Sequence, residues 1–163
     1  YCPGISIELL IPDFCYNRPA VKTVVEAGPD IIAHNVETVP SLYALVRPQA
    51  EYRRSLEVLA YVKKLVPSMH TKSGLMVGLG ERKEEVSRVF ADLRNAECDF
   101  LSIGQYLAPS RAHYPVKEYI APDTFEYYKA EAEGLGFLHV ESAPYVRSSY
   151  RAAEYLKKVE AKA

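Results

Sequence analysis

Cysteine is scarce in this sequence, and its distribution excludes several classes of protein. The three cysteines, Cys2, Cys15 and Cys98, are odd in number and far apart. They therefore predict neither a disulfide framework nor a metal site of the usual close spacing, and we expect reduced thiols in a cytosol-like compartment. No apolar run is long enough to cross a bilayer, and no basic leader precedes an apolar stretch, so neither a membrane anchor nor a signal peptide is predicted.

The sequence also lacks an excess of charge of either sign. Lys and Arg number 20 and Asp and Glu number 21, giving a formal net charge of −1, which argues against a nucleic-acid or membrane partner. The 163 residues, 48% of them hydrophobic, suffice for a single domain over residues 1–163. There is no initiating Met and the chain begins almost at once in a predicted strand, so we expect it to be a piece of a longer protein.

The stretch of residues 71–81, TKSGLMVGLGE, organises the rest of the chain. Its apolar middle predicts a buried strand, which Gly78 and Gly80 follow, and Glu81 opens an amphipathic helical run. Glycines at the end of a strand let the backbone turn tightly or approach a ligand closely. Strand, glycine-rich loop and helix form the unit of a β/α sheet, whose ligands bind at the loops after the strands. A tight turn that binds nothing is the alternative.

Strands and helices alternate along the chain. Hydrophobic patterns predict strands over 5–11, 31–33, 71–77, 100–103 and 137–140, and helices over 19–27, 52–66, 81–96, 122–133 and 152–162, with a short helix near residues 42–46. Long helical connections indicate a parallel sheet. Four βα units cannot close an eight-stranded barrel, so the fold class is α/β, either an open sheet or part of a barrel.

Polar residues gather where the predicted strands begin and end. Asn35 and Glu37 leave the second strand and point the same way because they are two residues apart; amide plus carboxylate suits a ribose diol or an amino group. The alternative is a turn-capping Asn35 and a solvated Glu37. Lys72 pairs with an acid or holds an anionic group, unless it snorkels to the surface. Since parallel strands end at one rim, a shared pocket is plausible.

Residues 147–150, Arg-Ser-Ser-Tyr, form the last polar cluster. A serine-hydrolase site is disfavoured because there is no nearby base and no glycine elbow. From the residues alone, Ser148 or Ser149 is interpreted as a cap of the terminal helix. The four histidines are too dispersed to predict a metal site, and no catalytic residue is assigned.

Taken together, several long runs resemble the lipoyl synthase family of radical S-adenosylmethionine enzymes. The runs are LIPDF, HNVETVP, LYALVRPQAEYRRSLEVL, TKSGLMVGLGE, LSIGQYLAPSRAHYPV and GFLHVESAPYVRSSYRA, and they cover nearly the whole chain in order. The resemblance implies a partial TIM-type barrel of six βα units, of which this chain supplies the later four plus a C-terminal tail.

The resemblance also implies roles for particular residues. Asn35 and Glu37 fall where the family contacts S-adenosylmethionine, and GLMVGLGE, with Gly78, corresponds to the glycine-rich motif that borders the nucleoside. Lys72, Ser73 and Gln105 fall on the neighbouring rim of the same binding site. Ser148, or less favourably Ser149, corresponds to the serine ligand of an auxiliary four-iron cluster.

The family chemistry implies the cofactors and partners. A first 4Fe-4S cluster reduces S-adenosylmethionine to a radical that abstracts hydrogen from an octanoyl chain, and a second 4Fe-4S cluster supplies two sulfur atoms. The octanoyl chain is carried by a lipoyl carrier protein or lipoyl domain. An electron donor and an iron–sulfur carrier protein are further partners, and the location is the cytoplasm, or the mitochondrial matrix in a eukaryote.

The sequence departs from the family pattern in its cysteines. The CxxxCxxC loop and the second cysteine triad of the family are both absent, and clusters of this type need several thiolates. We therefore interpret the chain as the C-terminal part of a lipoyl synthase that is inactive alone. The alternative is a non-catalytic remnant that binds a nucleoside or a carrier protein; a relative of biotin synthase is disfavoured by the Arg-Ser-Ser-Tyr run.

Overall fold

Five parallel strands form the centre of the computed structural model, which describes residues 4–150 and 154–156. The strands are β1 (Glu8–Leu10), β2 (Ile31–Ala33), β3 (His70–Val77), β4 (Phe100–Gln105) and β5 (His139–Ser142). They lie side by side in sequence order, β1-β2-β3-β4-β5, and every neighbouring pair is parallel. The structure therefore confirms the α/β class and agrees with four βα units of a partial barrel.

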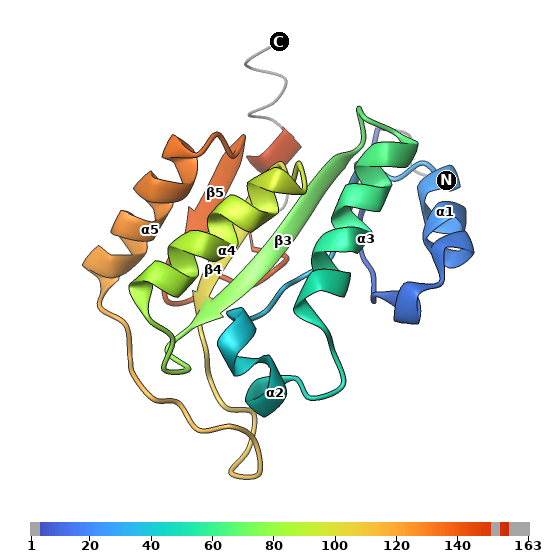
Figure 1. The fold of residues 1–163 in the computed structure, drawn as a ribbon. Helices are drawn as coiled ribbons and strands as arrows, with labels where there is room; N and C mark the ends of the chain where they lie inside the picture. The colour runs from blue at the N-terminus through green and yellow to red at the C-terminus, as the bar shows by residue number, and fades with distance from the viewer. Residues whose placement is uncertain (1–3, 151–153, 157–163) are drawn as a thin grey trace.

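The helices connect consecutive strands and cover one face of the sheet (Figure 1). They are α1 (Arg18–Glu26), α2 (Tyr43–Val46), α3 (Tyr52–Leu65), α4 (Lys83–Asn95) and α5 (Pro122–Gly134), with short 3-10 turns over Phe14–Tyr16 and Pro40–Leu42. Of the predicted terminal helix, residues 154–156 are helical and the remainder lies outside the described residues. In the part of the chain that the structure describes, no helix combines the length and apolarity needed to cross a membrane.

Alternation along the strands separates the two faces of the sheet. On the helix side, Leu75 and Val77 of β3 pack with Val86 and Phe90 of α4 in the largest hydrophobic cluster. A second cluster joins β2 to α1 and α3. The opposite, inner face carries Lys72 of β3 and Phe100 of β4, which pack against the C-terminal Tyr155. The inner face is thus the one that a barrel would enclose.

Several strand and helix ends differ from the sequence prediction; the fifth strand, for example, spans His139–Ser142 rather than residues 137–140. The first strand is shorter than residues 5–11 because it lies at the sheet edge, where Ile5 and Ile7 are exposed. The fourth strand extends to Gln105, whose N–H donates to the carbonyl of Pro144. Helix α4 begins at Lys83 rather than Glu81, because the Glu81 carboxylate accepts hydrogen bonds from the N–H groups of Gly78 (2.6 Å) and Leu79 (2.9 Å).

The loop after β3 is closed by the side chain of Gln105. Its Nε2 donates to the Glu118 carbonyl (2.9 Å), and its Oε1 accepts from the Ile120 N–H (2.9 Å). Gly78 has φ of +96°, and a Cβ there would collide with both Gln105 Nε2 and the Glu118 oxygen. Glycine is required here both for its backbone angle and for the close approach of residues 105–120.

We expect Gly78→Ala to lower the free energy of unfolding by about 2–4 kcal/mol, the sum of an unfavourable positive φ and a steric overlap. Gly136 is a matched control, because its φ is +92° but nothing lies within 4 Å of an added Cβ. Gly136→Ala should therefore cost only about 1 kcal/mol. Urea denaturation of both variants measures the difference, and equal losses would contradict the steric argument.

Candidate functional site

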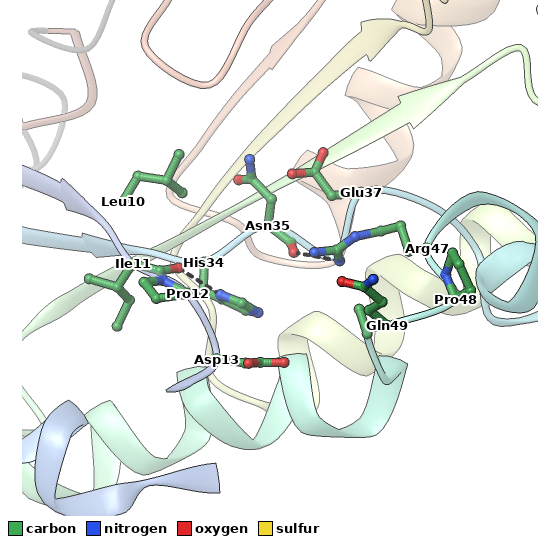
Figure 2. A pocket seen from close by; sticks show the side chains of 11 residues that line it. Leu10, Ile11, Pro12, Asp13, His34, Asn35, Glu37, Arg47, Pro48 and Gln49 are labelled. Atoms are coloured by element: carbon green, nitrogen blue, oxygen red, sulfur yellow. Dashed lines mark hydrogen bonds between the residues drawn. The ribbon is translucent and has the colours of Figure 1, made fainter. Parts of the chain in front are cut away.

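A cavity of about 650 Å³ lies where β1 and β2 end, beside the loop after α2 (Figure 2). It is lined by the end of β1, by the segment after β2 and by the loop of residues 47–50. The lining residues are Leu10, Ile11, Pro12, Asp13, His34, Asn35, Glu37, Arg47, Pro48, Gln49 and Ala50. A cavity of this volume suits a nucleoside-sized ligand, and it lies at the carboxyl ends of parallel strands, where such folds bind their ligands.

Asn35 lies on the inner face of the sheet and depends on a glycine in the next strand. An added Cβ on Gly74 would lie 2.7 Å from Asn35 Oδ1, so a larger residue at position 74 would displace the amide from its present position. Figure 2 shows the Asn35 and Glu37 side chains on the same side of the chain. The two side chains thus share a direction as the sequence predicted, although Glu37 itself does not have the extended backbone on which that prediction relied.

Glu37 is held by backbone pairing with β3, although the regular strand β2 has already ended. Its N–H donates to the Gly74 carbonyl (2.9 Å), and its own carbonyl accepts from the Met76 N–H (2.8 Å). The residue adopts φ of +65°, a conformation unusual for a side chain other than glycine. The two hydrogen bonds stabilise that conformation and so fix the direction of the carboxyl group.

Burial raises the pKa of Glu37, and the Asn35 amide and the Arg47 charge oppose this rise. Desolvation disfavours the charged carboxylate, whereas a hydrogen-bond donor or a cation favours it. A ligand that donates hydrogen bonds to the Glu37 carboxyl group would therefore favour its ionised form. A ribose diol or an ammonium group can donate such hydrogen bonds.

Arg47 lines the same cavity and was not selected from the sequence. Its Nη1 donates weakly to three neutral oxygens, the carbonyls of Asn35 and Val36 at 3.5 Å and the Tyr43 hydroxyl at 3.4 Å. Because its hydrogen-bond acceptors among residues 4–150 and 154–156 are neutral, this guanidinium can recognise an anionic group such as a carboxylate. Nothing in the sequence separated this arginine from the surface arginines, because its position depends on the fold of the loop after α2.

His34 is a buried member of the cavity lining, only 4% exposed. Its Nδ1 lies 2.9 Å from the Ile11 carbonyl, and because a carbonyl only accepts, Nδ1 carries the proton. Nε2 is then an acceptor, and it has no hydrogen-bond partner among the residues that the structure describes. Burial lowers the pKa of His34, which keeps the ring neutral.

The other predicted binding residues are not among the residues that line this cavity. Ser73 Oγ accepts from the Val36 N–H (3.2 Å) on the helix side of the sheet. Gly78 and Gln105 belong to the loop closure after β3. Lys72 lies 1% exposed on the inner face, paired with Glu8. Their contacts with a cofactor remain predictions, and the structure gives each of them a partner within the chain.

A second cavity of about 460 Å³ adjoins the first and shares Glu37 and Arg47 with it. Apolar and aromatic residues form much of its lining, which comprises Glu37, Leu45, Val46, Arg47, Met76, Tyr106, Pro109, Ala112, His113 and Tyr114. The carboxyl and guanidinium groups therefore stand between the two cavities. Such an arrangement can hold a polar cofactor next to an apolar chain.

Ser148 lies in a turn over residues 147–150, in which the Tyr150 N–H donates to the Arg147 carbonyl (2.8 Å). The main-chain oxygen of Ser148 accepts a hydrogen bond from Lys72 Nζ at 2.5 Å. The predicted helix-capping role of Ser148 or Ser149 involves residues 151–153, which lie outside the described residues. The structure thus places Ser148 against the inner face of the sheet, far along the chain from the cavity residues.

Iron–sulfur clusters do not fit the side chains that the structure describes. Cys98 is fully buried and burial raises the pKa of its thiol to about 12, Cys15 is exposed, and Cys2 lies outside the described residues. Within residues 4–150 and 154–156, no three His, Cys, Asp or Glu side chains converge at metal-binding distance. A thiolate-held cluster needs several such ligands.

Comparison with known proteins gives a consistent set of relatives. The family model described as "Radical SAM superfamily" matches residues 1–93. The chain is 58% identical over 154 residues to a lipoyl synthase of Alkaliphilus metalliredigens (strain QYMF), covering 94% of this chain and 53% of that protein. It is 60% identical over 153 residues to a lipoyl synthase of Geobacter sulfurreducens, covering 94% and 50%. The chain spans about half the length of the curated relatives it matches.

The raised pKa of Glu37 predicts the pH dependence of stability. The folded state holds the proton more tightly, so stability is fully present below the unfolded pKa, ordinarily near 4.3, and falls as pH rises through the folded pKa. Gln does not titrate, so Glu37→Gln removes this fall in stability at high pH. We expect Glu37→Gln to be more stable than the unmodified chain at pH 8 and to lose that advantage at pH 4, as measured by urea denaturation.

Glu85 is the control of opposite sign for this measurement. Hydrogen bonds from the Arg82 N–H and neighbouring side chains lower the pKa of Glu85 to about 2. Its contribution to stability is therefore present above the unfolded pKa and is lost as pH falls toward 2. Glu85→Gln should destabilise the chain at pH 8, and a Glu37→Gln variant that behaves the same way would refute the assigned cause.

Proposed function

The chain belongs to the radical SAM superfamily, and we propose that it is the C-terminal part of a lipoyl synthase. The proposed reaction inserts two sulfur atoms into an octanoyl chain carried by a protein, forming protein-bound lipoate. One observation carries the proposal: the HNVET run sets Asn35 and Glu37 side by side in a nucleoside-sized cavity at the strand ends. High identity to lipoyl synthases over more than nine-tenths of the chain supports it.

We assign S-adenosylmethionine to the cavity after β2. The Asn35 amide and the Glu37 carboxyl offer the acceptors and donor that ribose hydroxyls or an amino group need, and Arg47 offers a charge to a carboxylate. The bound cofactor would supply the radical chemistry, and the residues of this chain would bind it, orient it and keep water away. The neighbouring cavity, which Leu45, Val46 and Met76 help to line, is our assignment for the octanoyl chain.

The substrate and partners follow from this assignment. The octanoyl chain would be presented by a lipoyl carrier protein or lipoyl domain, with an electron donor and an iron–sulfur carrier protein serving the clusters. We place the reaction in the cytoplasm, or in the mitochondrial matrix if the source is a eukaryote. Lys72, Ser73, Gly78 and Gln105 support the site through contacts within the chain, and direct contact with the cofactor stays a prediction for them.

The 163 residues of this chain would not carry out the reaction by themselves. Cys2, Cys15 and Cys98 do not have the spacing of either cysteine motif of the family, and the described side chains do not gather into a metal site. We therefore propose that the 163-residue chain by itself is catalytically inactive. Iron and sulfide analysis after anaerobic reconstitution tests this proposal, and production of 5′-deoxyadenosine from S-adenosylmethionine by the isolated chain would overturn it.

Ser148 is the proposed ligand to one iron of the auxiliary cluster, whose cysteine ligands are absent from these residues. Its turn lies against the inner face of the sheet, the same face on which Asn35 and Glu37 are found. An oxygen ligand is harder than a thiolate and would release its iron more readily, which suits a cluster that gives up sulfur. Arg147, the residue before Ser148, carries a positive charge that would favour the ionised form of the Ser148 hydroxyl.

The binding role of Glu37 is tested in the complete protein that contains these residues. Glu37→Ala should weaken S-adenosylmethionine binding by roughly 10- to 150-fold, because a hydrogen bond to a charged group is worth about 1.5–3 kcal/mol. Calorimetric titration measures the dissociation constant. Glu26→Ala, at an exposed position on α1, is the control that should leave binding unchanged. Unaltered affinity in Glu37→Ala would return Glu37 to a structural role.

The role of Ser148 is tested by separating two products of the reaction. In the complete protein, Ser148→Ala should sharply reduce lipoyl formation while S-adenosylmethionine cleavage persists, since cleavage depends on the other cluster. Loss of a helix cap would instead cost about 1 kcal/mol of stability and leave sulfur insertion intact. Ser149→Ala is the matched control. If only Ser149→Ala loses lipoyl formation, the ligand is Ser149; if both variants remain active, neither serine is a ligand.

A further inference from the structure

Two glycines on the inner face of the sheet leave space for other segments of the chain to approach it closely. Gly74 and Gly104 lie on neighbouring strands, where Met76 pairs with Gly104 in the register of β3 and β4. Asn35 stands over Gly74 on one side. On the other side, the main chain at Val146 approaches Gly104 so closely that an added Cβ would collide with its carbonyl. The turn of residues 147–150 therefore approaches the same inner surface as the cavity residues.

The side chain of Lys72, on β3, contacts both this turn and the neighbouring part of the sheet. Its Nζ lies 3.0 Å from both carboxylate oxygens of Glu8 on β1 and 2.5 Å from the main-chain oxygen of Ser148. The same ammonium lies 3.9 Å from the centre of the Tyr155 ring. One buried cation thus contacts the first strand, the C-terminal turn and the residue that packs on Phe100 and Ile31.

Burial of the Lys72 ammonium group favours one particular position of the turn of residues 147–150. Removing a charge from water is strongly unfavourable unless hydrogen bonds and a counter-charge replace the water. Burial lowers the pKa of Lys72, and the Glu8 carboxylate opposes that shift. Because Glu8 supplies only part of the required coordination, the Ser148 carbonyl is needed as a further acceptor. A displaced turn would leave the ammonium under-coordinated, so the turn is favoured in one position.

We propose that Lys72 is a positioning residue of the synthase, which tethers the turn of residues 147–150 to the inner face through the main-chain oxygen of Ser148. The inference rests on the proposed function in that the turn carries Ser148. It assigns to Lys72 a contact with the backbone of the turn, beside the contact with cofactor that the sequence predicts. Since the tether grips a carbonyl, it does not depend on the Ser148 side chain.

Hydrogen exchange tests the tether directly in the complete protein. In Lys72→Met the amide of Tyr150, which closes the turn on Arg147, should exchange about tenfold faster or more as the turn opens locally. Lys63→Met is the matched control, because Lys63 is 7% exposed, is paired with Asp99 at 2.5 Å and belongs to α3. Exchange at Tyr150 should be unchanged in Lys63→Met. Equal protection in the two variants would overturn the proposal.

A second comparison separates the tether from the side chain that it positions. Ser148→Ala retains the carbonyl, so its turn should keep the protection of the unmodified protein, whereas Lys72→Met should not. Loss of protection in Ser148→Ala equal to that in Lys72→Met would overturn the proposal. If Lys72→Met does not fold, Glu8→Gln weakens the same cluster by removing one charge, and it should raise Tyr150 exchange in the same direction but by less; no change would count against the tether.

Product analysis then tests the positioning role. Lys72→Met should lower the lipoyl product formed per S-adenosylmethionine cleaved by about tenfold or more, the effect expected when a reacting group is misplaced. Lys63→Met should leave this ratio unchanged, since a general loss of stability reduces both products together. A normal ratio in Lys72→Met overturns the positioning role. If the unmodified protein makes no lipoyl product, the proposed function fails, while the exchange comparison still decides whether the tether exists.

Discussion

The pairing of the chain after β2 with β3 is the constraint on which the cavity depends. Glu37 exchanges two backbone hydrogen bonds with β3, one with Gly74 and one with Met76, beyond the end of the regular strand. These bonds hold Glu37 at a positive φ and fix the segment between it and Ala33. They therefore help to keep the Asn35 and Glu37 side chains on one side of the backbone.

Other contacts of the site build on that segment. The Tyr43 hydroxyl donates to the Val36 carbonyl at 2.5 Å, and Arg47 reaches the carbonyls of Asn35 and Val36. The loop after α2 is therefore fastened to the same few peptide groups that β3 positions. Glycine at position 74 completes the arrangement by leaving space for the Asn35 amide. Recognition groups from two segments thus share one short backbone scaffold.

The inner face of the sheet carries the polar features that distinguish this chain from an ordinary β/α sheet. Apolar alternation directs Leu75 and Val77 toward the helices, so the residues between them, Gly74 and Met76, must face inward. Lys72, on the same side, is compensated by Glu8 and by the C-terminal turn. Burial of that charge couples the two ends of the described chain to its central strand.

Local pattern alone determined the order of elements and the parallel sheet, because hydrophobic periodicity and short turns are encoded by neighbours in sequence. Tertiary structure decided which polar groups meet. Lys72 and Gln105 leave or enter strands as the sequence indicated, yet Lys72 pairs with Glu8 and Ser148, while Gln105 closes the loop after β3. Arg47 and His34 enter the cavity. These partners lie far away along the chain, and a single sequence contains no signal for which distant polar groups burial will bring together.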